Sequence, residues 1–195
     1  MVDENILKQY GAVGKQLNKG ETLFQEGDPP IFYYQVVDGE IKLNNYNSNG
    51  KEMIQGIYSR GEGFGAPALL GDFVVCSNAE ATKPTQLICL EKSYFVRMLK
   101  DHPHISFQFL QKISKRLQFK TMIAKEINCH EAEQRILNLF KYLKKEAGEE
   151  SEFQIRLTRQ TIANIIGLRV ETVIRTIKNL KEKGLIQVKN RKLYL

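Results

Sequence analysis

The side chains best suited to chemistry lie in a short stretch near the carboxyl end of the chain. Glu171 and Arg175 are four residues apart, which is the spacing of neighbours on one face of a helix. The forked donors of an arginine match the O6 and N7 atoms of guanine, and a glutamate accepts from the N4 amino group of cytosine. The same spacing also allows an ion pair between the two side chains. The pattern therefore predicts either a pair that contacts bases or a surface ion pair.

The residues around this pair are suited to two kinds of contact with a duplex. Aliphatic side chains can touch the methyl group of thymine, and charged or hydroxyl side chains can bond to base edges. Contacts to phosphate position a protein on DNA without specifying a sequence. The expected base-contacting set is Arg169, Val170, Glu171, Thr172, Ile174 and Arg175. The expected phosphate-contacting set is Thr158, Arg159, Gln160, Lys178, Lys189, Arg191 and Lys192.

Two short helices joined by a tight turn must position these side chains. Thr158 is a favourable N-cap for a helix over residues 159–166. Gly167 can adopt the left-handed conformation that a tight turn between helices needs. A second helix is then expected over residues 169–181, with the base-contacting set near its start. This arrangement predicts a helix-turn-helix.

Residues within and around the two helices complete a small domain. Within the helices, Ala163 and Val173 are spaced so that the helices can approach each other and pack together at the turn. Residues 185–195 are expected to form a hairpin with a basic turn, which would be the wing of a winged helix-turn-helix. A helix over residues 131–147 with one apolar face precedes them. We therefore expect a DNA-binding domain over residues 131–195.

The distribution of charge favours contact with a polyanion. The net charge of the 195 residues is +7. Residues 1–104 hold 10 basic and 13 acidic side chains, whereas residues 105–195 hold 19 basic and 9 acidic ones. A strongly basic segment is typical of a surface that meets nucleic acid, although a solvated basic face without a partner has the same composition.

The first hundred residues have the pattern of a β domain. Short segments bounded by turns predict strands at residues 21–25, 31–37, 40–46, 52–58 and 85–90. Asp38-Gly39 is a strong signal for a tight hairpin that pairs the second of these strands with the third. Glycines at 61, 63 and 65 interrupt regular structure before an apolar segment at 66–70. We expect an antiparallel sandwich or roll over residues 1–104.

A helical region follows the strands. Ser93 is expected to cap a helix over residues 94–100, and residues 105–127 contain no Gly or Pro and predict a long helix. Apolar residues with one lysine, Lys120, recur along it at the spacing of a heptad seam: Leu110, Ile113, Leu117, Ala124 and Ile127. The seam predicts a parallel dimer helix with a hinge, over residues 105–130, or a helix packed on its own β domain.

Several segments of the chain resemble the CRP/FNR family of bacterial transcription regulators. The strongest likeness is in Leu157–Gly167 (LTRQTIANIIG) and Val170–Arg175 (VETVIR). Further likeness is found in Gly20-Glu21, Gly27-Asp28, Gly63-Phe64-Gly65, Arg116-Leu117-Gln118 and Glu133–Ile136. The resemblance implies an α+β fold with an N-terminal antiparallel β-roll (jelly roll), a long dimerisation helix and a C-terminal winged helix-turn-helix. It also implies a homodimer that binds palindromic double-stranded DNA and RNA polymerase. Residues 1–5 lack the basic-then-apolar order of a secretory signal, so we expect a cytoplasmic protein.

The recognition segment resembles the FNR branch more than the cyclic-AMP receptor branch. The cyclic-AMP receptor branch has an arginine where Val170 stands here. The FNR branch favours half-sites resembling TTGAY, with the glutamate and arginine on the central G·C pair. That branch has a serine where this chain has Ile174, so this chain departs from its pattern at the residue before Arg175.

The effector segment of the family aligns with residues that lack the groups a cyclic nucleotide needs. Cyclic-nucleotide binders place a glutamate for the ribose where this chain has Ala66, and an arginine for the phosphate near Cys76-Ser77. No Arg or Lys occurs from residue 62 to residue 82, so the phosphate would lack a charged partner. The candidate pocket residues are Gly63, Phe64, Gly65, Ala66, Cys76, Ser77, Lys120 and Thr121. We expect no tight binding of cyclic AMP.

Other classes of function fit the sequence less well. The N-terminal segment has no cysteine for an iron–sulfur cluster, whereas His102, His104, His130, Cys76, Cys89 and Met98 are conceivable haem ligands. No motif of a nucleophile and base, or of metal ligands, is present, so we expect no enzyme and no bound metal. No apolar run is long enough to span a membrane. A cyclic-nucleotide module and a haem-based sensor are the alternatives to a DNA-binding regulator with another effector.

Overall fold

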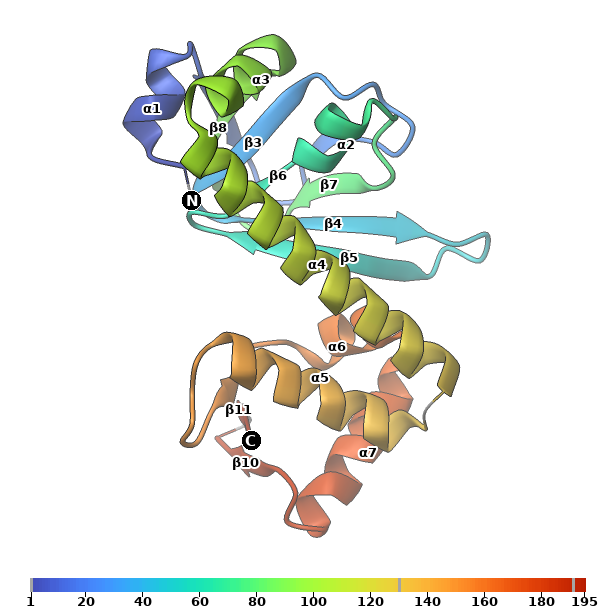
Figure 1. The fold of residues 1–195 in the computed structure, drawn as a ribbon. Helices are drawn as coiled ribbons and strands as arrows, with labels where there is room; N and C mark the ends of the chain where they lie inside the picture. Colours follow the sequence, from blue (N-terminus) through green and yellow to red (C-terminus); the bar gives the residue numbers. More distant parts are fainter. Residues whose placement is uncertain (1, 130, 191) are drawn as a thin grey trace. The chain divides into compact units, whose positions relative to one another are not determined.

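The computed structural model describes residues 2–129, 131–190 and 192–195 (Figure 1). The chain divides into two compact units, Met1–Lys115 and Arg116–Leu195. The division falls within the helix that was expected over residues 105–127. In the described residues no helix is both long enough and apolar enough to cross a membrane.

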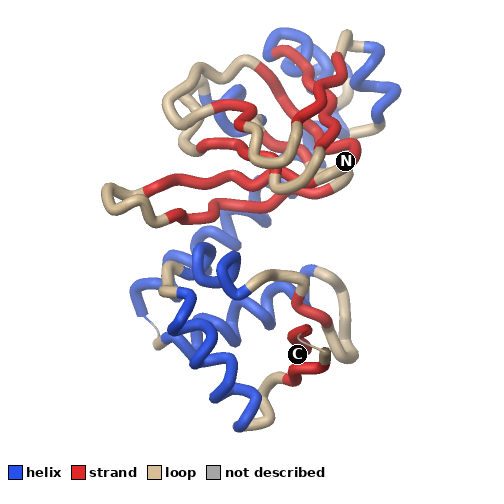
Figure 2. Tube along the Cα trace, turned by 180° about the vertical axis from the view of Figure 1, so that it is seen from behind, coloured by secondary structure: helices blue, strands red, loops and turns tan. Residues whose placement is uncertain are grey.

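The first unit contains two four-stranded antiparallel sheets (Figures 1 and 2). One sheet has the order β1 (Val13–Leu17), β8 (Thr85–Glu91), β3 (Phe32–Asp38) and β6 (Gly63–Phe64). The other has the order β2 (Thr22–Phe24), β7 (Asn78–Ala81), β4 (Glu40–Tyr46) and β5 (Glu52–Ser59). The expected antiparallel β-roll is therefore confirmed. The sequence patterns missed β1, β6 and β7.

The hairpin expected at Asp38-Gly39 is wrong. β3 pairs with β6 and β8, whereas β4 pairs with β5 and β7, so the turn carries the chain from one sheet to the other. Gly39 has φ 96°, and a Cβ atom there would meet the backbone of Thr85. The N–H of Glu40 donates to the Oγ1 atom of Thr85 over 2.9 Å. The local signal marks a true turn, but long-range contacts decide which strands pair.

Helices pack on the β1–β8–β3–β6 sheet. α1 (Glu4–Gln9), α2 (Ala66–Gly71) and α3 (Lys92–Asp101) share one buried cluster with this sheet. Tyr33 of β3 stacks on Phe95 of α3 with ring centroids 4.7 Å apart. The cluster faces away from the second sheet, because alternate residues of a strand point to opposite faces. This buried cluster packs the three helices against the outer face of the sheet.

The cap expected at Ser93 is wrong. α3 begins at Lys92 and its N-cap residue is Glu91, so Ser93 lies inside the first turn. The hydroxyl of Ser93 donates to the Oε1 atom of Glu91 over 2.9 Å. Strand β8 ends at Glu91, and the chain therefore enters the helix directly from the sheet.

α4 runs from Pro103 to Cys129 and belongs to both units. The long helix predicted over residues 105–127 is confirmed and is slightly longer at each end. Proline is compatible with the first turn of a helix, because the N–H that it lacks would have no intrahelical partner there.

The second unit contains three more helices and a small sheet. The helices are α5 (Ala132–Glu146), α6 (Arg159–Ile166) and α7 (Val170–Glu182). The sheet has the order β10 (Gln187–Lys189), β11 (Lys192–Tyr194) and β9 (Gln154–Ile155). The core of this unit contains four fully buried side chains from its helices: Ile136, Phe140, Ile162 and Leu180. The predicted winged helix-turn-helix is confirmed.

Candidate nucleic-acid interface

One face of α7 is buried and the opposite face is exposed. Val173, Thr176, Ile177 and Leu180 point into the core. Glu171, Ile174, Arg175 and Lys178 are exposed. Ile174 and Arg175 lie three and four residues after Glu171, and Lys178 lies four and three residues after them, so all four share one face. Arg169 is exposed at the N-cap position, and Val170 and Thr172 are half-buried. The expected base-contacting residues thus lie at the start of α7, with the charged ones on its free face.

Glu171 and Arg175 keep their polar atoms available. Among the described residues neither side chain forms an ion pair or a hydrogen bond, so the alternative of a mutual ion pair is not realised here. Both would exchange water for base edges on binding, without first breaking a bond within the protein.

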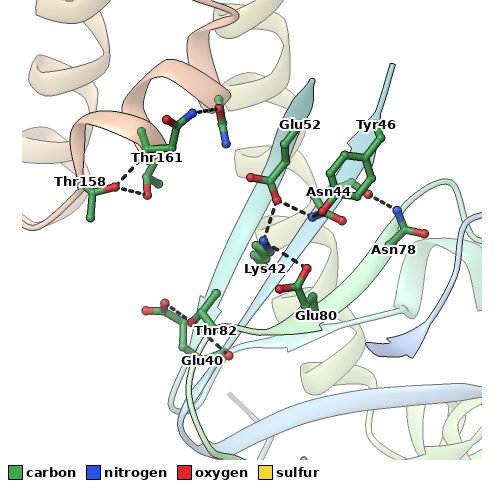
Figure 3. A network of polar contacts seen from close by, with 12 residues as sticks. Glu40, Lys42, Asn44, Tyr46, Glu52, Asn78, Glu80, Thr82, Thr158 and Thr161 are labelled. Atoms are coloured by element: carbon green, nitrogen blue, oxygen red, sulfur yellow. Dashed lines mark hydrogen bonds and ion pairs between the residues drawn. The ribbon is translucent and has the colours of Figure 1, made fainter. Parts of the chain in front are cut away.

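The turn before α7 is held by the residues expected to form it. The Oγ1 atom of Thr158 accepts from the N–H of Thr161 over 3.0 Å and lies 2.8 Å from its hydroxyl (Figure 3). Gly167 ends α6 with φ 71°, and its N–H donates to the carbonyl of Ala163. Ala163 and Val173 are fully buried at the joint. The predicted cap, turn and joint are all confirmed.

An arginine links α6 to α4, and sequence patterns did not identify this role. Arg135 of α5 donates to the carbonyl of Ile127 over 2.7 Å and to that of Ile166 over 3.5 Å. Those carbonyls lie near the ends of α4 and α6, where helices leave carbonyls without an intrahelical partner. Asn138 donates to the buried Glu126 over 2.9 Å. Residues from three helices therefore support the helix-turn-helix.

The expected phosphate-contacting residues differ in their exposure and in whether their side chains already bond to other residues. Lys192 is exposed and has no ion pair among the described residues. Lys189 pairs with Glu152 and lies 5.5 Å from the ring of Tyr194. Lys178 lies 3.9 Å from Glu182, Gln160 bonds to Asn164, and Arg159 is half-buried. Arg191 lies outside the described residues. Among the described cations of the wing, Lys192 is therefore better placed for a phosphate than Lys189, which is paired with Glu152.

Aromatic rings fill the space between the two sheets of the roll, where the effector segment begins. Phe64, which is 2% exposed, stacks on Tyr34 with ring centroids 5.2 Å apart and meets Tyr58 at 5.1 Å. Phe24 packs on Tyr34 at 5.6 Å. Burial raises the pKa of Tyr34 to about 12. This part of the roll is therefore apolar and closely packed.

The other expected pocket residues do not converge on a polar site. Ala66 is buried at the start of α2, next to Gly65, whose φ is 87°. Cys76 is exposed, and its carbonyl accepts from the side-chain amide of Asn45 over 2.8 Å. Lys120 and Thr121 are exposed on α4 and belong to the second unit. The expected pocket residues on the roll include no Lys or Arg that could pair with a cyclic phosphate.

The roll carries a polar network on the β4–β5–β7 sheet that the sequence patterns did not indicate. Lys42 pairs with Glu52 at 2.7 Å and with Glu80 at 3.2 Å (Figure 3). Asn44, fully buried, donates to Glu52 over 2.5 Å. The lysine is thus committed to carboxylates of neighbouring strands, and it is not available for an anionic ligand.

The seam residues on α4 differ in exposure. Leu110 and Leu117 are 61% and 65% exposed, and Ala124 is exposed as well. Ile113 is half-buried, and Ile127 is half-buried beside Gly167. Phe107 is another exposed apolar residue of this helix, at 62%. α4 therefore presents large apolar side chains that neither unit covers by itself.

Those conceivable haem ligands that the structure describes do not lie together at one place. Met98 and Cys89 are buried in different clusters, and Cys76 is exposed. His102 and His104 are neighbours with ring centroids 5.7 Å apart, and His130 lies outside the described residues. Within residues 2–129, 131–190 and 192–195, no group of three His, Cys, Asp or Glu side chains could hold a metal ion.

Comparisons with known proteins agree with this architecture. Residues 14–102 match the cyclic nucleotide-binding domain family, and residues 134–195 match the Crp-like helix-turn-helix domain family. The chain is 26% identical over 184 residues to the transcriptional regulatory protein btr of Bordetella pertussis, covering 92% of this chain and 76% of that protein. It is 26% identical over 192 residues to the fumarate and nitrate reduction regulatory protein of Escherichia coli, covering 96% and 75%.

A solved structure shows the same fold over the whole length. The c-di-GMP-responsive global regulator CLP of Xanthomonas campestris superposes with a TM-score of 0.78 at 21% identity, and 99% of each chain is covered. The two domain families match in the order cyclic nucleotide-binding domain, then helix-turn-helix domain, and the similar proteins are transcription regulators with the same fold. These findings together assign the chain to a family. The chain belongs to the CRP/FNR family of DNA-binding transcription regulators.

Proposed function

We propose that this regulator acts as a homodimer that places two copies of α7 in the major groove of a palindromic duplex. The free face of α7, with Glu171 and Arg175 unpaired among the described residues, carries this proposal. Arg175 would donate to guanine and Glu171 would accept from cytosine. The two half-sites would lie about 34–36 Å apart, one turn of the duplex.

The remaining partners follow from this role. A regulator bound at a promoter meets RNA polymerase, and we propose that this chain contacts it there. It would work in the cytoplasm and would carry out no catalysis. The exposed leucines of α4 support the homodimer, because apolar side chains at heptad spacing are covered when two such helices pair.

We further propose that the effector of this chain is not cyclic AMP. The packing of Phe64 against Tyr34 and Tyr58 between the sheets supports this, because a nucleotide would have to displace these rings. Ala66 has no group for a ribose hydroxyl. A cyclic phosphate would be desolvated without a charged partner, which is unfavourable.

Selection from a random duplex pool, followed by fluorescence anisotropy, tests the DNA contacts. We expect Glu171→Ala and Arg175→Ala to lose about 1–3 kcal/mol each on the selected site and to relax preference at one G·C pair. Lys192→Ala is the control, and it should weaken selected and random duplexes alike because phosphate carries no sequence information. Equal losses on both duplexes for the first two variants would contradict the assignment.

Calorimetry tests the effector proposal. Titration of the purified chain with cyclic AMP should release no heat of binding at micromolar protein concentration. Its affinity for the selected duplex should be the same with and without the nucleotide. Nanomolar binding of cyclic AMP would refute the proposal, and a Soret band in the purified chain would point to haem instead.

A further inference from the structure

Ile174 is an unusual residue for the free face of α7. Its side chain is 56% exposed, although isoleucine is among the residues most often buried. In the described part of residues 131–195, the exposed large apolar side chains are Ile174 and Leu185. Glu171 precedes Ile174 by three residues and Lys178 follows it by four, so the three share one face. An apolar side chain is thus framed by charged ones.

The position of Ile174 within the helix limits what can cover it. α7 begins at Val170, and the first turns of a recognition helix face the base edges. The major-groove edges of the four bases carry hydrogen-bonding groups, and thymine alone adds an apolar one, its C5-methyl group. An isoleucine cannot bond to the polar groups, and it would desolvate them at a cost.

We propose that Ile174 packs against the C5-methyl group of a thymine next to the base pair that Arg175 contacts. The inference rests on the proposed function, since it requires α7 to lie in the major groove. A branched side chain in a helix has one strongly preferred χ1 rotamer, so its methyl groups stand in a fixed direction. This residue therefore selects thymine by apolar contact, without a hydrogen bond.

Removal of single methyl groups from the DNA tests this contact. In the duplex selected from the random pool, each thymine is replaced in turn by deoxyuridine, which differs only by the methyl group. We expect the affinity of the native chain to fall about fourfold per half-site at one thymine, the effect of exposing one buried methyl-sized group. Placing cytosine there should also weaken binding, and 5-methylcytosine should recover part of the loss.

Variants of the protein show whether Ile174 makes the contact. Ile174→Ala should bind the thymine and deoxyuridine duplexes equally, and Ile174→Val should keep most of the discrimination. Leu185→Ala is the matched control, because it removes the other exposed large apolar side chain of this unit and should leave the discrimination unchanged. Thermal unfolding of each variant verifies that it is folded.

The outcomes separate this inference from the proposed function. If no duplex is preferred over random DNA, the proposed function itself fails. If a duplex is preferred, but every deoxyuridine substitution affects the native chain and Ile174→Ala to the same extent, the assignment of Ile174 is overturned while the proposed function stands.

Discussion

Two cysteines of the roll differ in exposure, and this difference in surroundings determines how reactive a thiol can be. Cys76 is exposed on the loop after α2, whereas Cys89 is 5% exposed among apolar side chains between the sheets. Burial raises the pKa of the Cys89 thiol from 9.0 to about 11. The thiolate is the reactive form, so Cys89 is a structural residue at neutral pH.

The raised pKa of Cys89 predicts a loss of stability at alkaline pH. Between pH 9.0 and about 11 the thiol of the unfolded chain loses its proton while the buried thiol keeps it. The free energy of unfolding should therefore fall as the pH rises through this window. Urea unfolding at several pH values measures the slope, which Cys89→Ala should reduce. Cys76→Ala serves as the control, and an unchanged slope in Cys89→Ala would contradict the prediction.

Among the elements, the helix-turn-helix is specified by patterns within a short stretch of sequence, whereas the roll depends on pairing between strands that are far apart in the sequence. The cap at Thr158, the turn at Gly167 and the three-four spacing of buried residues on α7 all lie within about two dozen residues of sequence. For this reason the sequence predicted that unit to within a residue or two. The pairing of β3 with β8 joins residues between 48 positions apart (Asp38 and Gln86) and 59 positions apart (Phe32 and Glu91), and no local pattern encodes it.

The turn at Gly167 predicts the effect of a single added methyl group. Its φ of 71° lies in the left-handed region, where a residue with a Cβ atom is strained by about 1–2 kcal/mol. Gly167→Ala should destabilise the second unit by about this amount and weaken DNA binding. Gly167→Asn is the control, because asparagine tolerates this conformation better. Urea unfolding measures both, and equal stability of the alanine variant and the native chain would refute the prediction.

For the whole molecule the central element is α4, because it begins in the unit that contains the roll and ends in the unit that contains the helix-turn-helix. Its exposed residues Leu110 and Leu117 are seven positions apart, which is one heptad. A helix with such residues is stabilised when a second copy covers them. Two copies of α7 would then meet two half-sites at once, which raises affinity for a palindrome far above that for one half-site.

Charge placed in the seam should separate the copies. We expect Leu117→Lys to shift the chain from dimer to monomer in analytical ultracentrifugation, because the lysines would be buried close together. Its affinity for a palindrome should fall, whereas its affinity for an isolated half-site should not change. Gln118→Lys adds the same charge at an exposed neighbouring position and should remain dimeric. A native chain that is monomeric at micromolar concentration would contradict the prediction.

Sequence patterns alone predict the class of fold, the helix-turn-helix and the residues on its free face, because caps, turns and helical periodicity act over short distances. They did not reveal that Arg135 links α6 to α4, nor that aromatic rings from β2, β3, β5 and β6 fill the roll. Those features join side chains from separate elements. Only tertiary packing brings these side chains together, because the sequence around each one does not fix which distant residue it will contact. Their burial likewise depends on how the sheets and helices assemble.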